Sequence, residues 1–189
     1  MRNLLQKEWF QTVLWIFFVL LLVFFTTRFI GQRAVVDGPS MESTLHDGDN
    51  MILDKISYRF SDPERYDIVV FPGQLDEAGN KTMYIKRIIG LPGETVEIKD
   101  GKIYIDGLVL NTDIYAKDGI TEEGSPEFNN ITLKENEYYC LGDNREVSED
   151  SRYIGPVYLD RGLFHSVALH EIIGKIRIRV FPFNKIKVF

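Results

Sequence analysis

The sequence has few of the side chains that build disulfides, metal centres and histidine-based catalytic sites. A single cysteine, Cys140, excludes an intramolecular disulfide. It lies in the apolar segment 138–141, where we expect a buried strand residue, and no nucleophile motif surrounds it. Of the three histidines, His165 and His170 are five residues apart, so they do not share a helix face as zinc-protease histidines do. We therefore expect neither a metal ion nor a cofactor.

An excess of basic residues is also absent. The chain has 22 Lys and Arg against 28 Asp and Glu, a formal net charge of −6. Nucleic-acid-binding proteins usually carry a basic excess or patch, so we expect no nucleic-acid partner. The length of 189 residues fits one domain, or one domain with an anchor, and nothing in the sequence specifies an oligomeric state.

One long hydrophobic run is present, near the N-terminus. Residues 13–25 are all apolar, and residues 9–27, as a helix, would span about 28 Å, close to the hydrocarbon thickness of a bilayer. A cleavable signal peptide would need small residues after the run, and a buried core helix would need a polar face; neither is present. We predict a short cytoplasmic tail over residues 1–8 and one transmembrane helix over residues 9–30. Basic residues flank both ends, so charge does not fix its orientation.

The remainder, residues 31–189, reads as a mainly β domain of coiled antiparallel sheets. Asp100-Gly101 and Asp106-Gly107 are strong hairpin signals, and they fall in a small β insertion that we predict over about residues 95–138. We expect Pro72-Gly73 to end a strand, and residues 163–172 to form a short helix. The expected strands are 34–37, 50–56, 68–71, 83–89, 95–98, 102–105, 108–110, 138–141 and 175–181.

Three clusters can carry chemistry. Ser40 follows a Gly-Pro turn, Lys86 lies in the apolar strand YIKRII, and residues 142–152 form a dense polar run, GDNREVSEDSR. Burial in an apolar strand would lower the pKa of Lys86. Each cluster also has a structural interpretation: a serine capping a turn, a lysine on a solvent-facing strand side, and a solvated loop.

Other catalytic patterns are less well supported. The chain has neither a Gly-x-Ser-x-Gly elbow at Ser40 nor a Ser-x-x-Lys motif. His46 is close enough in sequence to serve Ser40 as a base, although its polar turn favours a surface position. Acid/base roles remain open for two carboxylate pairs, for which turn and salt-bridge roles are commoner: Asp47 with Asp49, and Asp143 with Asp150.

Taken together, the motifs resemble those of the bacterial type I signal peptidases. The matching segments, in order along nearly the whole chain, are SM at 40–41, GDNMILDK at 48–55, YIKRIIGLPGE at 84–94, GDNR at 142–145 followed by Ser148 and DSR at 150–152, and GK at 174–175. The resemblance implies that Ser40 is the nucleophile and Lys86 the general base. It further implies that Ser148 orients the Lys86 amine, and that Asp150 and Arg152 form a supporting ion pair.

The resemblance also sets expectations for the cleft. The Ser40 backbone N–H would be one oxyanion donor, but Gly38 stands where some members have a serine that supplies a second. Ser43 stands where the family usually has proline. Shallow apolar pockets would select small substrate residues at −1 and −3, and the candidates to line them are Val36, Met41, Leu45, Tyr84 and Ile85.

The implied function is an endopeptidase that removes N-terminal signal peptides from exported preproteins. The modest stretch between the lysine segment and residue 142 looks like the compact Gram-positive branch. The implied location is the cell membrane, in contact with lipid, single-pass, with the catalytic domain extracytoplasmic. Two alternatives are another Ser/Lys protease of the same fold, such as a self-cleaving repressor, and an inactive membrane-tethered β adaptor. The apolar anchor disfavours the first, and the intact Ser40, Lys86 and Ser148 disfavour the second.

Overall fold

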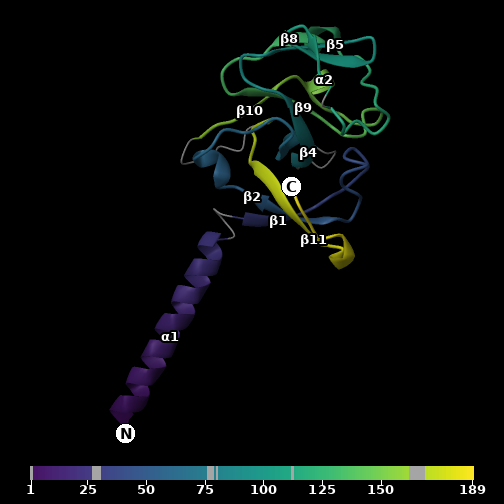
Figure 1. Ribbon diagram of the computed structural model, residues 1–189. Coiled ribbons are helices and arrows are strands. Elements are labelled where there is room, and N and C mark those ends of the chain that lie inside the picture. The colour runs from purple at the N-terminus through teal and green to yellow at the C-terminus, as the bar shows by residue number, and fades with distance from the viewer. Residues whose placement is uncertain (1, 27–30, 76–78, 80, 112, 162–168) are drawn as a thin grey trace.

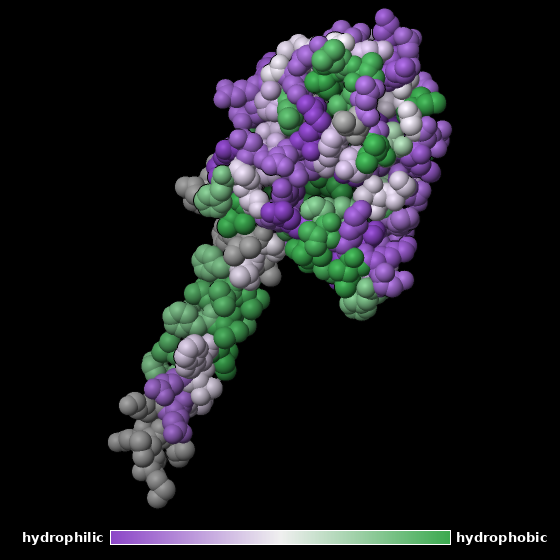
Figure 2. Space-filling model, viewed as in Figure 1, coloured by the Kyte–Doolittle hydropathy of each residue, from purple (hydrophilic) through white to green (hydrophobic). Residues whose placement is uncertain are grey.

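The N-terminal helix stands apart from the rest of the molecule. The computed structural model describes residues 2–26, 31–75, 79, 81–111, 113–161 and 169–189, with backbone only for 2–7 (Figure 1). Helix α1 (Arg2–Phe25) contains an 18-residue stretch, Glu8–Phe25, of mean hydropathy 2.0, none of which is buried. Its middle is continuously hydrophobic in Figure 2, whereas hydrophilic residues cover much of the visible face of the domain. This helix is apolar on every side and is not buried by the domain. Its length is also sufficient to cross a membrane.

The rest of the described chain forms two antiparallel sheets. The larger has the order β1-β2-β11-β3-β4-β9-β10, with β12 also paired to β11, and the smaller has the order β7-β6-β5-β8. The expected fold class, mainly β antiparallel sheets after one apolar helix, is confirmed. The strands of the large sheet are β1 (Gly31–Val35), β2 (Asn50–Asp54), β3 (Ile68–Leu75), β4 (Lys81–Gly90), β9 (Glu137–Leu141), β10 (Val157–Tyr158), β11 (Gly174–Phe181) and β12 (Lys187–Val188).

The small sheet is built from tight hairpins. Its strands are β5 (Thr95–Lys99), β6 (Lys102–Ile105), β7 (Leu108–Val109) and β8 (Asn130–Thr132), all inside the range 95–138. Asp100, Gly101, Asp106 and Gly107 all have positive φ, between 51° and 78°. Two successive positive-φ residues match the twist of two-residue hairpin turns, so both hairpin signals in the sequence are confirmed. Short helices complete the described chain: η2 (Ser57–Arg59), η3 (Pro126–Phe128), α2 (Ser151–Ile154) and η4 (Phe183–Lys185).

Strand β4 is buried on both faces over its second half. Each residue from Lys86 to Gly90 is buried, because β3 and β9 flank the strand and apolar clusters cover both sides. Ile88 packs in one cluster with Val69 and Phe71, whereas Ile89 packs in another beneath the small sheet. A strand covered on both faces removes every side chain from water, including any charged ones.

One expectation about a strand is wrong. Pro72 and Gly73 do not end β3, which runs on to Leu75. The missing N–H of Pro72 is tolerated because β11 pairs only with Val69 and Val70, so Pro72 lies beyond that ladder. A Cβ at Gly73 would lie 2.5 Å from the Tyr84 ring, so only glycine fits there.

In strand β11, basic and apolar residues alternate along the sequence. Register shifts between Ile176 and Ile178 and between Arg179 and Phe181 break the alternation and bury Arg179, which pairs with Asp49 at 2.8 Å. Residues 163–168 of the expected helix over 163–172 lie outside the described residues. Of its remainder, 169–170 form a turn and Glu171 bridges to Tyr158.

Candidate active site

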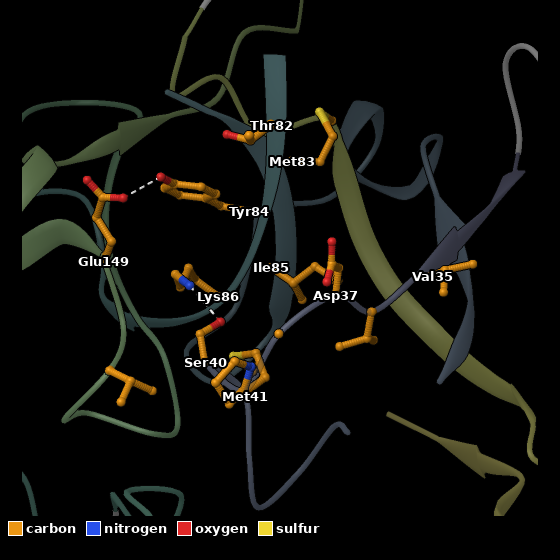
Figure 3. Close-up of a pocket in the computed structure, with 14 residues that line it drawn as sticks. Val35, Asp37, Ser40, Met41, Thr82, Met83, Tyr84, Ile85, Lys86 and Glu149 are labelled. Atoms are coloured by element: carbon orange, nitrogen blue, oxygen red, sulfur yellow. Dashed lines mark hydrogen bonds between the residues drawn. The ribbon is translucent and has the colours of Figure 1, made fainter. Parts of the chain in front are cut away.

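Ser40 and Lys86 come together from distant parts of the chain. Ser40 lies in the connection between β1 and β2, and Lys86 lies near the middle of β4. The Lys86 amine donates a hydrogen bond to Ser40 Oγ at 2.8 Å (Figure 3). Lys86 is only 3% exposed, whereas Ser40 is partly exposed. The pair therefore joins a buried amine to a hydroxyl that faces a cleft.

The turn that carries Ser40 is anchored on both sides. Met41 and Leu45 are fully buried, and the Leu45 N–H donates to the Met41 carbonyl at 2.9 Å. On the other side, the Gly38 N–H donates to the Asp47 carboxylate at 3.0 Å, and Gly38 has a φ of 88° that favours glycine. These contacts fix the serine at the end of a short, rigid turn.

Burial decides the protonation state of Lys86. Desolvation lowers the pKa of Lys86 to about 8, outweighing the opposing effect of the Asp150 and Glu149 carboxylates. Among the described residues, no carboxylate lies within salt-bridge distance of the amine. A neutral amine at 2.8 Å from a hydroxyl is placed to accept the hydroxyl proton.

The polar run of residues 142–152 is a buried network rather than a solvated loop. Arg152 Nε and Asp150 Oδ1 form an ion pair at 2.8 Å, and both side chains are fully buried. Arg152 also donates to the carbonyls of Arg145 (2.6 Å) and Ser148 (3.3 Å), and Asp150 Oδ2 accepts from the Gly142 N–H at 3.0 Å. The ion pair thus closes the loop on itself and sets its shape.

Ser148 lies beside the turn that carries Ser40. Its hydroxyl is buried and makes no hydrogen bond within the part of the chain that the structure describes, so none reaches Lys86. A Cβ at Gly142 would lie 2.2 Å from Ser148 Oγ and 2.5 Å from the Ser40 carbonyl oxygen. Glycine at 142 therefore allows the loop of Ser148 to pack directly on the turn of Ser40.

Asn144 is a site residue to which the sequence assigned no role. Its backbone N–H donates to the Ser40 carbonyl at 3.0 Å, and its Nδ2 donates to the Pro39 carbonyl at 3.3 Å. Asn144 therefore holds the peptide groups on both sides of Ser40. Its place in the GDNR motif was the available signal, but only the fold reveals a partner 105 residues away.

Arg87 occupies the opposite face of β4. Its guanidinium donates to both carboxylate oxygens of Asp143, at 2.8 and 2.7 Å, and to the Tyr66 carbonyl at 2.9 Å. It also lies 3.7 Å from the centroid of the Tyr115 ring. Arg87 and Asp143 are both buried, so both charged groups of this ion pair are removed from water.

A cleft of about 560 Å³ opens beside the Ser40–Lys86 pair (Figure 3). Four of the five expected pocket residues line it: Val36, Met41, Tyr84 and Ile85. The fifth, Leu45, does not; it is fully buried and packs in the same apolar cluster as Val36 and Met41. The other lining residues include Val35, Asp37, Thr82, Met83, Val147 and Glu149.

The other candidate acid/base groups, His46 and the carboxylate pairs, have partners or positions outside the cleft. His46 is exposed, does not line the cleft, and has its Nδ1 4.0 Å from Asp49 Oδ2. Asp143 and Asp150 each pair with an arginine, and Asp49 pairs with Arg179. Within the described ranges, no three His, Cys, Asp or Glu side chains gather closely enough to hold a metal ion.

Comparison with known proteins assigns the chain to a family. The family model described as signal peptidase, peptidase S26, matches residues 9–181. The chain belongs to this family. It is 30% identical to signal peptidase IB of Staphylococcus aureus strain N315 over 196 aligned positions, which cover 97% of this chain and 95% of that protein. By this membership the chain is a serine endopeptidase.

Two further relatives match shorter parts. The chain is 35% identical over 160 residues to a probable signal peptidase I-2 of a Synechocystis species, covering 84% of this chain and 66% of the relative's length. A crystal structure of a signal peptidase I from Enterococcus faecalis V583 is 36% identical and covers 52% of this chain and 91% of that chain, with a TM-score of 0.40.

Proposed function

We propose that this chain is a membrane-anchored signal peptidase in which Ser40 and Lys86 form the catalytic dyad. The observation that carries the proposal is the 2.8 Å contact between the Lys86 amine and Ser40 Oγ. The amine is buried, whereas the Ser40 hydroxyl faces a cleft. The substrates are exported preproteins, from which the enzyme removes the N-terminal signal peptide.

Lys86 acts as the general base. With a pKa of about 8, about half of the Lys86 amines are neutral at pH 8, against roughly one in 250 for a free lysine. As Ser40 Oγ attacks the scissile carbonyl carbon, its proton moves to the Lys86 amine. The ammonium then protonates the leaving amine, and a water molecule hydrolyses the acyl-enzyme with Lys86 again as the base. Ser148 orients the amine during these transfers.

Asn144 supports the oxyanion donor. In a trans peptide the C=O and the following N–H lie in one plane and point in opposite directions. By holding the Pro39 carbonyl, Asn144 Nδ2 therefore aims the Ser40 N–H away from itself. This supports the Ser40 N–H as a donor to the negative charge that develops on the scissile carbonyl oxygen.

The cleft supports a preference for small residues at −1 and −3. In an extended chain, residues two apart point to the same side, so both of these substrate side chains face one wall. The expected lining residues Val36, Met41, Tyr84 and Ile85 offer an apolar wall for short side chains.

The apolar, unburied helix α1 supports a single-pass anchor in the lipid bilayer. The placement of the catalytic domain outside the cytoplasm is what the family resemblance implies. Anchoring raises the effective concentration of the enzyme near substrates that are themselves held in the membrane. Protease added to intact protoplasts should digest the domain after residue 30. Protection until the cells are lysed contradicts this orientation.

The test of function is cleavage of a purified preprotein by the full chain in detergent, with and without Ser40→Ala. We expect the wild type to release the signal peptide and Ser40→Ala to release none, with unchanged circular dichroism. Equal processing by both proteins would remove Ser40 as the nucleophile. A folded wild type that cleaves no preprotein would favour the inactive adaptor.

A further inference from the structure

We infer that Glu149 makes this enzyme prefer substrates with a cationic side chain near the scissile bond and disfavour those with an anionic one there. The inference rests on the proposed function, because it concerns the peptide that occupies the cleft. Glu149 follows Ser148 in the polar loop and lines the same cleft as Ser40 and Lys86.

The Glu149 side chain is fixed at the wall of the cleft. Its Oε2 accepts a hydrogen bond from the Tyr84 hydroxyl at 2.5 Å, and its Oε1 accepts one from Gln74 Nε2 at 2.6 Å. Figure 3 shows the carboxylate meeting Tyr84 to one side of the Ser40–Lys86 pair. A side chain held by two strands in this way presents its charge at a constant position.

Neither donor neutralises that charge. Tyr84 and Gln74 are both neutral, and burial together with the Glu149 hydrogen bond raises the pKa of Tyr84 to about 12, which keeps its proton in place. Glu149 is exposed and has no ion-pair partner among the residues that the structure describes. Two of the carboxylate's roughly four acceptor sites therefore remain for another donor.

No other described residue that lines the cleft compensates the charge of Glu149 when the Lys86 amine is neutral. Asp37 also lines the cleft, on the other side of the Ser40–Lys86 pair in Figure 3. The one basic residue among the described lining residues is Lys86, which is neutral in its active form. A bound peptide therefore lies in a negatively charged cleft, and the negative charge is close to the reacting atoms.

The expected effect is modest and depends on salt. A partly exposed ion pair changes affinity by up to about fivefold, and a like-charge contact acts in the opposite direction. Replacing a cationic by an anionic substrate side chain should therefore lower kcat/KM by roughly three- to tenfold. Since the screening length falls from about 10 Å at 0.1 M salt to about 3 Å at 1 M, the difference should shrink at high salt.

The test uses the full chain in detergent and one preprotein with single substitutions around its cleavage site, leaving −1 and −3 unchanged. At each position kcat/KM is measured for Lys, Gln and Glu substrates. We expect at least one position at which wild type favours Lys over Glu by roughly three- to tenfold. The Glu149→Gln variant keeps the shape of the side chain and should bring this ratio close to one.

The ratio is the informative quantity, because Glu149 also influences Lys86. Any change in Lys86 affects both substrates of one enzyme equally and cancels. The matched control is Glu146→Gln, which removes an exposed carboxylate from the same loop outside the cleft and should leave the ratio unchanged. Asp37→Asn tests the other acidic lining residue.

The outcomes are distinct. A Lys-to-Glu ratio of one at every position, with efficient cleavage of the Gln substrate, overturns the inference and leaves the proposed function intact. A ratio that survives in Glu149→Gln but disappears in Asp37→Asn or Glu146→Gln assigns the preference to another residue and also overturns it. Failure of the folded wild type to cleave even the Gln substrate removes the proposed function and this inference with it.

Discussion

The two faces of strand β4 treat adjacent basic residues in opposite ways. Lys86 and Arg87 are each 3% exposed, so the fold removes both from water. The Arg87 guanidinium donates hydrogen bonds to the Asp143 carboxylate and the Tyr66 carbonyl, whereas the Lys86 amine donates one to the neutral Ser40 hydroxyl and pairs with no carboxylate among the described residues. A guanidinium effectively stays protonated, so of these two buried residues only the lysine can become neutral. Desolvation without a paired carboxylate favours the neutral form, and desolvation with one preserves the charge.

The largest expected effect, on kcat/KM, comes from replacing Lys86 by arginine, the residue type that its neighbour Arg87 already has. Because a guanidinium effectively stays protonated, Lys86→Arg should lose activity as completely as Lys86→Ala, by at least roughly 10²-fold in kcat/KM. The measurement is preprotein cleavage, with circular dichroism to confirm folding. Activity retained by Lys86→Arg would mean that Lys86 acts as a charge, and His46→Ala would then test His46 as the base.

The next effect concerns the face of β4 on which Arg87 pairs with Asp143. Asp143→Asn leaves the buried Arg87 without its counter-charge, which should lower the free energy of unfolding by roughly 3–5 kcal/mol in urea titrations. The matched control is Glu42→Gln, which breaks the surface pair of Glu42 with Lys117 at 3.6 Å and should cost about 1 kcal/mol or less. Equal losses in the two variants would show that the Arg87 face is not a buried pair of this kind.

The sequence predicts one face of β4 better than the other. The apolar neighbours of Lys86 indicate burial, and the resemblance pairs it with Ser40. The pairing of Arg87 with Asp143 joins residues 56 apart, and that of Asp49 with Arg179 joins residues 130 apart. No local pattern encodes such partners, because they depend on which strands become neighbours in the sheet.

Local backbone features show the same limit. The Asp-Gly hairpins are predictable because both positive-φ positions lie within two residues of each other. The continuation of β3 through Pro72, and the register shifts that bury Arg179, depend on where β11 pairs with its neighbours. Leu45 was expected in a pocket from the family match, but its complete burial in one apolar cluster with Val36 and Met41 follows from packing.

A smaller effect should appear in the pH dependence of stability. The pKa of Lys86 falls from 10.5 to about 8 on folding, so between these values the unfolded chain binds more protons and stability rises with pH. Relative to Lys86→Met, wild type should gain about 2 kcal/mol in unfolding free energy between pH 7 and pH 10. A difference that is flat or falls over this range would show that folding does not depress this pKa.

The smallest expected effect separates positioning from stability. The buried Ser148 hydroxyl has no partner within the described residues, so Ser148→Ala should change unfolding free energy by no more than about 0.5 kcal/mol. Loss of one orienting hydrogen bond during catalysis should lower kcat by about tenfold, with KM unchanged. Wild-type kcat in Ser148→Ala would remove Ser148 from the mechanism, and a rise in KM alone would assign it to substrate binding.

The most direct test of the dyad is the titration of Lys86 itself. In the full chain in detergent, carbon-13 labelling of lysine Cε reports each amine by NMR, and the Lys86 signal is assigned by its loss in Lys86→Arg. We expect a Lys86 titration midpoint of about 8. A midpoint near the ordinary lysine value of 10.5 would mean that Lys86 is charged when the enzyme works, and would contradict its role as the base.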